Sequence, residues 1–223
     1  MTDLDKLSLA ALEEIDGVNF LGLGSGLTVS AFVKSLGTYV SSKGIKLSVI
    51  PSSVQIQLIA ESVGLHIVDY SYLPKLDIVV DGADQIDSDL NLLKGGGGAL
   101  FRERLLITSA SSIIILANEN KFSTTLDLPV AIEVSSFARS LVKQKLELLG
   151  GVPELRSNEK GYPYVTDNGN LIFDTSFGKI IEPRQLYSNL KLIPGVIDAG
   201  IFTLDSLLVL KQMNNGEIKH LTK

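Results

Sequence analysis

Apolar strands and helical segments alternate over about the first 120 residues, and this alternation constrains the fold more than any other feature of the chain. The expected strands are nearly continuous apolar runs at residues 18–23, 46–50, 76–80 and 113–117. A strand that is apolar on both faces must be covered on both faces, which is typical of a parallel sheet between helices. The sequence therefore predicts an α/β fold with a parallel sheet.

The rhythm of the sequence changes after Asp127-Leu128-Pro129. The segments expected there are a strand at 130–134, a helix at 137–149 and a hairpin around the turn at 167–170. We expect residues 1–127 and about 204–223 to form the parallel-sheet domain, and about 128–203 to form a second, smaller α+β domain. The last apolar segments, 199–204 and 207–210, are expected to return to the main sheet.

The composition excludes several kinds of functional site. The 223 residues include two histidines and no cysteine, which excludes a disulfide framework, a thiolate zinc site, an iron–sulfur cluster and a cysteine nucleophile. The formal charge is -5, whereas nucleic-acid-binding proteins usually carry a clustered basic face. No uncharged apolar run approaches the ~18–20 residues of a membrane span, and the first residues do not resemble a signal peptide. We therefore expect a cytoplasmic protein without a nucleic-acid or membrane partner.

Three polar clusters directly follow expected strands, at residues 24–28, 81–84 and 118–121. In an open parallel sheet the carboxyl ends of the strands share one edge, and ligands bind beyond that edge. We therefore expect these clusters to converge on one site.

The first cluster, Gly24-Ser25-Gly26-Leu27-Thr28, joins a strand to a helix and offers backbone amides to an anion. Ser25 and Thr28 add hydroxyl groups. The spacing matches neither a P-loop nor a dinucleotide fingerprint, and the second strand ends in Ile50-Pro51-Ser52 without an acid. The pattern favours a small phosphate over a nicotinamide cofactor. A tight turn with Thr28 as a helix cap is the alternative.

The second cluster places two carboxylates, Asp81 and Asp84, on either side of Gly82-Ala83. Carboxylates accept hydrogen bonds from sugar hydroxyls, and one of them can move a proton. The small residues between them let a ligand approach the backbone. Two alternatives remain: magnesium bound together with Asp87 and Asp89, or a turn whose aspartates cap backbone groups.

Four consecutive glycines, Gly95 to Gly98, follow Lys94 and precede a helix expected at about 99–110. Glycines lose more backbone entropy on folding than other residues, so such a run between ordered elements needs a reason. A close-fitting cradle for an anion or hydroxyl, with the Lys94 cation beside it, explains the run better than a flexible linker does.

Glu103 lies in that helix. At about 100° per residue its direction falls among those of Ala99, Leu100, Leu106 and Ile107. An acid centred on an apolar face suits a catalytic base, and pairing with Arg102 or Arg104 is the alternative. Lys121, which closes the third cluster, is a candidate contact to a phosphate or oxyanion.

Taken together, these motifs resemble type A ribose-5-phosphate isomerase over nearly the whole chain. The residues that carry the resemblance are Gly24-Ser25-Gly26-Leu27-Thr28, Asp81-Gly82-Ala83-Asp84, Lys94 to Leu100 with Arg102-Glu103, Asn120-Lys121, Thr166 to Asn170, and Ile193-Pro194-Gly195-Val196. The resemblance implies a Rossmann-like parallel-sheet domain with a smaller α+β domain, assembled as a homodimer or homotetramer. It also implies interconversion of D-ribose 5-phosphate and D-ribulose 5-phosphate in the pentose phosphate pathway, without metal or organic cofactor.

The same resemblance implies roles for the candidate residues. Glu103 is the base that carries a proton between C2 and C1 through an enediolate, while Asp81 and Asp84 hold hydroxyls and assist ring opening. Lys94 stabilises the developing oxyanion. The implied substrate-binding residues are Ser25, Gly26, Leu27 and Thr28 for the phosphate, with Gly82, Ala83, Gly95, Gly96, Gly97 and Lys121 as further contacts.

Three positions depart from the family pattern. Leu27 stands where a serine is usual, Gln85 stands where a glutamate is usual, and Lys6 is only a loose counterpart of a phosphate-contacting lysine. One rival interpretation is a non-catalytic sugar-phosphate-binding module, which would not need Glu103. The others are a nucleotide-dependent oxidoreductase, a related isomerase on a similar fold, and an acyl transferase with Glu103 as nucleophile.

Overall fold

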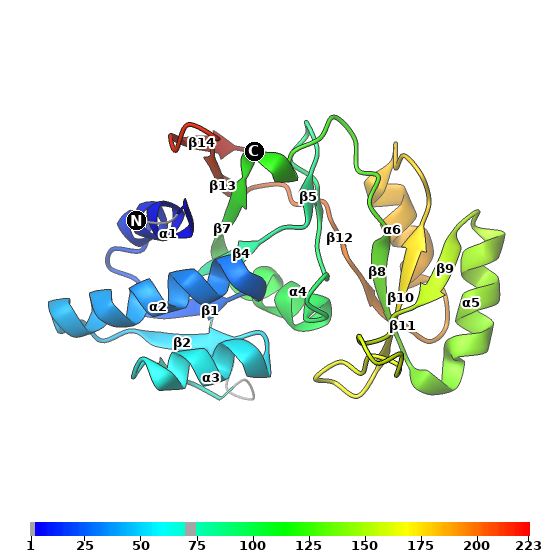
Figure 1. The fold of residues 1–223 in the computed structure, drawn as a ribbon, viewed down its shortest axis with the longest axis horizontal. Helices are drawn as coiled ribbons and strands as arrows, with labels where there is room; N and C mark the ends of the chain where they lie inside the picture. Colours follow the sequence, from blue (N-terminus) through cyan, green and yellow to red (C-terminus); the bar gives the residue numbers. More distant parts are fainter. Residues whose placement is uncertain (1–2, 70–74) are drawn as a thin grey trace. The chain divides into compact units, whose positions relative to one another are not determined.

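The computed structural model describes residues 3–69 and 75–223 (Figure 1). The chain divides into two compact units, which are described separately. The parallel-sheet unit comprises Met1–Ala83, Arg102–Lys121 and Asp205–Lys223, and the small unit comprises Asp84–Phe101 and Phe122–Leu204. No helix in the described part of the chain is long and apolar enough to span a lipid bilayer.

The parallel-sheet unit is built on a sheet whose order over the described residues is β14-β13-β7-β4-β1-β2-β3. Its strands are β1 (Phe20–Leu23), β2 (Ser48–Pro51), β3 (His66–Ile67), β4 (Leu76–Gly82), β7 (Ala110–Asn118), β13 (Leu208–Gln212) and β14 (Ile218–Thr222). All neighbouring pairs are parallel except β13 and β14, which are antiparallel. The predicted parallel sheet is confirmed.

Helices cover both faces of this sheet. The helices α1 (Asp3–Glu13), α2 (Gly26–Lys43) and α3 (Val54–Ser62) share one apolar cluster with strand residues such as Leu21 and Leu23. On the other face α4 (Leu100–Ser109) lies close to β1, because a Cβ added at Gly22 would meet Leu106 Cβ at 3.6 Å. Apolar side chains are needed on both faces of each strand, which explains the continuous apolar runs.

The small unit contains two sheets and two helices in the described residues. The larger sheet has the order β11-β8-β10-β9 and is antiparallel, and the smaller has the order β12-β6-β5. The elements are β5 (Gln85–Ile86), β6 (Leu92–Leu93), β8 (Val130–Val134), α5 (Arg139–Leu148), β9 (Val152–Leu155), β10 (Leu171–Ser176), α6 (Pro183–Lys191), β11 (Val196–Ala199) and β12 (Ile201–Phe202), with a short 3₁₀ turn, η3 (Ser136–Ala138), before α5. Proline at the start of α6 fits because it needs no amide partner there.

Two features of this unit differ from expectation. The segment 199–204 does not return to the main sheet, because Ala199 ends β11 and Ile201–Phe202 pairs with β6. Gly200 is held between two backbones: its amide donates to Ala131 O at 2.7 Å and its carbonyl accepts from Lys94 N at 2.9 Å. Because β12 pairs with β6, residues 84–101 belong to the small unit. The expected boundary at 127 had placed these residues in the parallel-sheet unit.

In the parallel-sheet unit, the expected return of 207–210 is confirmed, since β13 pairs in parallel with β7. The strand β14 was not expected. Its residues are mostly exposed and polar, so they lack the apolar signal that marks the other strands.

Candidate active site

The carboxyl edge of the parallel sheet gathers the three loops that sequence analysis singled out. The strands β1, β4 and β7 are adjacent and parallel, with Leu23 opposite Val80 and Asp81 opposite Ile115. Gly24 therefore follows β1 at the edge where β4 reaches Asp81 and Gly82. In the parallel-sheet unit, the predicted convergence is confirmed. Asp84 and the glycine run belong to the small unit and are described below.

Asp81 is the centre of the first group of site residues. Its side chain is fully buried, and its Oδ1 accepts hydrogen bonds from Gly82 N at 2.7 Å and from Ser25 N at 3.3 Å. A Cβ added at Gly24 would lie 1.8 Å from this Oδ1. Gly24 is thus required because the Asp81 carboxylate occupies the space of a side chain, a reason that the sequence pattern did not reveal.

Glu103 lies in the first turn of α4, and only 2% of its surface is exposed. Leu100 and Leu106 on the same face are fully buried, so the predicted placement of this acid among apolar residues is confirmed. The Ser25 hydroxyl donates to Glu103 Oε1 at 2.6 Å, the short distance typical of a hydroxyl on a carboxylate. Ser25 therefore links two buried acids, Asp81 through its amide and Glu103 through its hydroxyl.

The start of α2 presents the backbone of the glycine loop. Ser25, not Thr28, occupies the N-cap position, and its side chain makes no capping hydrogen bond because it is turned to Glu103. Gly26 begins the helix with a φ of +85°, a left-handed conformation that favours glycine. The Leu27 side chain is 78% exposed and Thr28 is half-buried. An uncapped first turn can bind an anion through its amides.

Lys121 ends the short 3₁₀ turn η2 (Glu119–Lys121) that follows β7. Its side chain is half-buried, and it belongs to the parallel-sheet unit together with Ser25, Asp81 and Glu103. Its position after β7 matches the expected third loop.

The second group of site residues lies in the small unit, where β5 and β6 pair as a hairpin. Asp84 precedes β5, and its amide donates to Leu93 O at 2.8 Å. Lys94 follows β6 and is only 4% exposed, with its Nζ 5.7 Å from the centre of the Phe202 ring. The half-buried Ala83 is the last residue of the other unit before Asp84.

The glycine run makes a tight turn above Asp84. Gly98 N donates to Gly95 O at 2.9 Å, and both residues have positive φ, +82° and +106°. Gly96 N donates to Asp84 Oδ2 at 2.8 Å, and a Cβ at Gly96 would lie 2.8 Å from Asp84 Oδ1. Gly96 and Gly97 are exposed at the tip of the turn. The run is therefore an ordered turn, as expected from its place between ordered elements.

Gln85 stands where the family pattern has a glutamate, and its side chain holds the backbone at Asp127 and Leu128. Its Oε1 accepts from Asp127 N at 2.8 Å and from Leu128 N at 3.1 Å, and its Nε2 donates to Asp127 Oδ1 at 2.6 Å. Both ends of this amide are used, which a glutamate could not reproduce because it has no N–H donor.

The magnesium alternative receives no support from the aspartates after β5. Asp87 accepts hydrogen bonds from Asp89 N at 3.0 Å and from Asn91 N at 2.8 Å, so its carboxylate closes a local turn. Across residues 3–69 and 75–223, no group of three or more His, Cys, Asp or Glu is placed to hold a metal ion. Asp87 thus caps backbone amides of its own turn.

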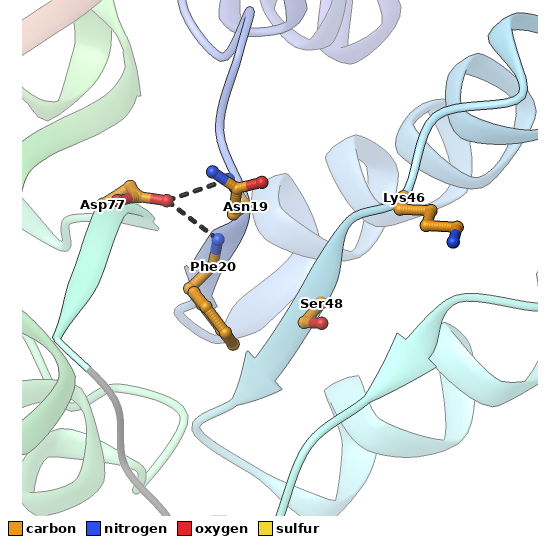
Figure 2. Close-up of a pocket in the computed structure, with 5 residues that line it drawn as sticks. All are labelled: Asn19, Phe20, Lys46, Ser48 and Asp77. Carbon is orange, nitrogen blue, oxygen red and sulfur yellow. Dashed lines mark hydrogen bonds between the residues drawn. The ribbon is translucent and has the colours of Figure 1, made fainter.

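A pocket of about 390 Å³ lies at the opposite, amino-terminal edge of the parallel sheet (Figure 2). It is lined by Asn19, Phe20, Lys46, Ser48 and Asp77. Asp77 Oδ2 accepts from Asn19 N at 2.8 Å and from Phe20 N at 2.9 Å. The bond from Phe20, and then the bond from Asn19, hold the pKa of Asp77 below its ordinary value. These bonds stabilise the start of β1.

Sequence analysis missed two side chains that contact the glycine run, Arg156 and Tyr164. Both donate hydrogen bonds to its carbonyl groups from about sixty residues further along the chain. Neither residue stands in a motif that indicates a site, and only the folded chain shows the contact.

Comparison with known proteins gives a consistent match. Residues 48–214 match the family model described as ribose 5-phosphate isomerase A (phosphoriboisomerase A). A ribose-5-phosphate isomerase A of Methanosarcina acetivorans is 39% identical over 96% of this chain and 92% of its own length. Ribose-5-phosphate isomerase A 1 of Oceanobacillus iheyensis is 38% identical over 98% of this chain and 100% of its own.

Solved structures agree with these sequence matches. A D-ribose-5-phosphate isomerase in complex with phospho-erythronic acid superposes with a TM-score of 0.94 at 34% identity, covering 99% of this chain and 98% of its own. The ribose 5-phosphate isomerase A of Methanocaldococcus jannaschii gives a TM-score of 0.90 at 30% identity, with the same coverage of both chains.

Proposed function

The chain belongs to the ribose 5-phosphate isomerase A (phosphoriboisomerase A) family, and we propose that the two groups of residues described above carry out the reaction of that family. The protein is an aldose–ketose isomerase that interconverts D-ribose 5-phosphate and D-ribulose 5-phosphate. The reaction opens the sugar ring and then moves a proton between C2 and C1 through an enediolate. It needs a base, acceptors for the sugar hydroxyls and donors for the oxyanion.

Glu103 is the proposed base, and its contact with Ser25 is the observation that carries the proposal. The acid is buried among apolar residues, and the Ser25 hydroxyl fixes Oε1 at 2.6 Å. A base that is held in one orientation needs little rearrangement to reach the C2 or C1 proton.

Asp81 and Asp84 are the proposed acceptors for sugar hydroxyls and the groups that assist ring opening. Each is held by a backbone amide, Asp81 by Gly82 at 2.7 Å and Asp84 by Gly96 at 2.8 Å. Gly82 and Ala83 between them carry no bulky side chain that would block a ligand from the backbone.

Lys94 and the amides of the glycine run are the proposed oxyanion stabilisers. Lys94 is nearly buried, so its charge acts in a less polar environment than a surface lysine would. Gly95 forms the base of the turn, and Gly96 and Gly97 expose their backbone at its tip. Donors that are fixed before the reaction stabilise developing charge without reorganising.

The first turn of α2 is the proposed phosphate site. Because the Ser25 hydroxyl is bonded to Glu103 and the Ser25 amide to Asp81, the phosphate is assigned to the amides of Gly26 and Leu27 and to the Thr28 hydroxyl. The amides at a helix N-terminus and the helix dipole both favour an anion. Lys121 supplies a further cationic contact to the substrate.

The proposal is tested by incubating the purified protein with ribose 5-phosphate after treatment with a chelator, and following ribulose 5-phosphate. We expect turnover that survives the chelator, because the proposed chemistry uses only carboxylates, a lysine and amides. Absence of turnover in untreated protein contradicts the proposed reaction. Loss of turnover on chelation alone contradicts only the claim that no metal is needed.

Assembly as a homodimer or homotetramer and a cytoplasmic location complete the proposal. Large apolar side chains are exposed in the small unit, with Phe137 at 98%, Leu192 at 80% and Leu148 at 78%, which favours a partner surface. Light scattering after gel filtration tests the assembly, and a monomer at micromolar concentration contradicts it. The absence of cysteine suits a reducing compartment, and cell fractionation tests the location.

A further inference from the structure

The carbonyl groups of the glycine run are held by side chains from a single hairpin of the small unit. Arg156 Nη1 donates to Gly95 O at 2.8 Å and to Gly96 O at 3.2 Å. The Tyr164 hydroxyl donates to Gly97 O at 3.0 Å. Three successive carbonyls of the turn are therefore fixed by two side chains.

Fixing these carbonyls also fixes the amides of the turn. In a planar trans peptide the C=O and N–H groups point in opposite directions, so holding a carbonyl aims the next residue's amide away from the holder. The Gly95 carbonyl faces Arg156, and the Gly96 amide of the same peptide donates to Asp84 Oδ2 at 2.8 Å. By the same geometry, the Arg156 contact with Gly96 O aims the Gly97 amide away from Arg156.

Arg156 is itself held rigidly. Its Nε donates to Asp174 Oδ2 at 2.8 Å and its Nη2 to Asp174 Oδ1, a two-bond contact that sets the plane of the guanidinium. Only 15% of the Arg156 side chain is exposed. The Tyr164 ring lies 5.8 Å from the guanidinium carbon, and Tyr164 N donates to Arg156 O at 2.9 Å.

The hairpin is anchored through the turn that follows Tyr164. Glu133 on β8 is fully buried, and its Oε1 accepts from Thr166 Oγ1 at 2.9 Å, Asn168 Nδ2 at 3.0 Å and Asn170 Nδ2 at 2.9 Å. This accounts for the polar turn at 166–170. The anchor keeps Tyr164 close to Gly98, where an added Cβ would lie 2.4 Å from the tyrosine hydroxyl.

We propose that Arg156 and Tyr164 are positioning residues for the isomerase reaction. Arg156 holds the Gly95 and Gly96 carbonyls so that the Gly96 and Gly97 amides face Asp84 and the substrate oxyanion. Tyr164 holds the Gly97 carbonyl and so fixes the Gly98 amide, which closes the turn onto Gly95 O at 2.9 Å. The inference rests on the proposed function of the glycine run. Both residues act through the backbone of the run and are not assigned a contact with the sugar. Asp174 in turn positions Arg156.

The test compares two conservative variants with two matched controls in the same unit. Arg156→Lys removes the forked contact, and Arg139→Lys is its control, because Arg139 also donates to a carbonyl, Ser136 O at 3.3 Å, away from the run. Tyr164→Phe removes one hydroxyl, and Tyr187→Phe is its control, because the Tyr187 hydroxyl donates to Asp198 at 3.0 Å.

We expect Arg156→Lys to lower kcat roughly 10–100-fold with KM changed less than about threefold, since misplaced oxyanion donors affect the transition state most. Tyr164→Phe is expected to lower kcat by less, and both controls to stay within about twofold of wild type. In the absence of substrate, the Gly96 and Gly97 amide resonances are expected to shift in Arg156→Lys and to stay in place in Arg139→Lys.

Unchanged kcat and unchanged Gly96 and Gly97 resonances in Arg156→Lys would overturn the inference, even if the variant melts at a lower temperature. A fall in kcat equal to that of Arg139→Lys would also overturn it, because the effect would then be general. If the wild-type protein does not convert ribose 5-phosphate, the proposed function fails, while the resonances of the ligand-free variants still decide whether Arg156 orients the amides.

Discussion

Two aspartates at opposite ends of β4, Asp77 and Asp81, have different surroundings, and the difference separates a structural carboxylate from a candidate catalytic one. They are four residues apart and so point to the same side of the strand. Each accepts backbone amides from beside β1: Asp77 from Asn19 and Phe20, and Asp81 from Ser25. Asp77 is partly exposed beside an open pocket, whereas Asp81 is fully buried.

The difference between the two ends shows what a carboxylate needs in order to be a candidate for catalysis. A buried charge loses much solvation and persists only where fixed partners replace the water. The carboxyl edge holds two buried acids with fixed partners, because Glu103 is also buried and both Glu103 and Asp81 accept hydrogen bonds from Ser25. At the amino edge the Asp77 carboxylate accepts two backbone amides and stabilises the start of a strand.

The largest expected effect is that of Glu103→Gln, compared with Asp77→Asn at the other edge. Gln keeps the shape of Glu and an acceptor for the Ser25 hydroxyl, so the fold should be preserved. Loss of the base should lower kcat by roughly 10²–10⁴-fold. Asp77→Asn removes the same charge and should leave kcat unchanged. Steady-state assays of both variants decide the point, and near-normal turnover by Glu103→Gln would rule out the assignment.

Gly24→Ala should come next, because it drives a Cβ into the Asp81 carboxylate, 1.8 Å from Oδ1. We expect the free energy of unfolding to fall by about 1–3 kcal/mol and the folded enzyme to lose most of its turnover. Gly22→Ala is the matched variant in β1, because its Cβ would meet Val79 Cγ2 at 2.6 Å and not a site residue. It should be destabilised yet active when folded, as measured by urea unfolding and by assay below the transition.

Ser25→Ala tests the link between the two buried acids. Removing the hydroxyl at 2.6 Å from Glu103 Oε1 should let the carboxylate turn, and kcat should fall about tenfold. Ser25→Thr restores a hydroxyl and should recover most of the loss. Ser62→Ala serves as the control, because that hydroxyl donates to Ile59 O within an exposed turn of α3. Equal kcat and KM for Ser25→Ala and wild type would contradict the claim that the Ser25 hydroxyl orients Glu103.

The smallest expected effect is the stability change in Asp77→Asn. The pKa of Asp77 is held below its ordinary value of 3.8 by backbone hydrogen bonds, so the folded state favours the ionised form. Its stabilisation is therefore complete above that value and is lost as the pH falls through the lower folded pKa. We expect the variant to be about 1 kcal/mol less stable at neutral pH, with the difference shrinking in acid. Urea titrations at several pH values measure it.

The sequence predicted those parts of the fold that depend on periodicity. Continuous apolar runs predicted the parallel sheet, and polar clusters after the strands predicted that loops with polar side chains gather at its carboxyl edge. Periodicity carried no information on β14, whose residues are mostly polar, or on the pairing of residues 92–93 with 201–202. Such pairings depend on backbone hydrogen bonds between distant segments, which leave no local pattern.

The candidate site was predictable in its residue types and less so in its contacts. Burial of Glu103 followed from its helical direction among leucines. Its partner Ser25 stands 78 residues away, and sequence analysis had given that hydroxyl to the phosphate. Gly24 was given no role of its own, while the structure shows that it makes room for Asp81. Contacts between side chains so far apart in sequence have no signal in a single chain.

The exposed Leu27 at the start of α2 has a consequence for how this enzyme can diverge. A main-chain amide is the same whichever residue carries it, and the leucine side chain is 78% exposed. A substitution at this position can therefore change the side chain without altering the peptide group that we propose binds the phosphate. Leu27→Ala would leave the amide in place and would therefore not measure its contribution to binding. Replacing the amide with an ester would measure that contribution.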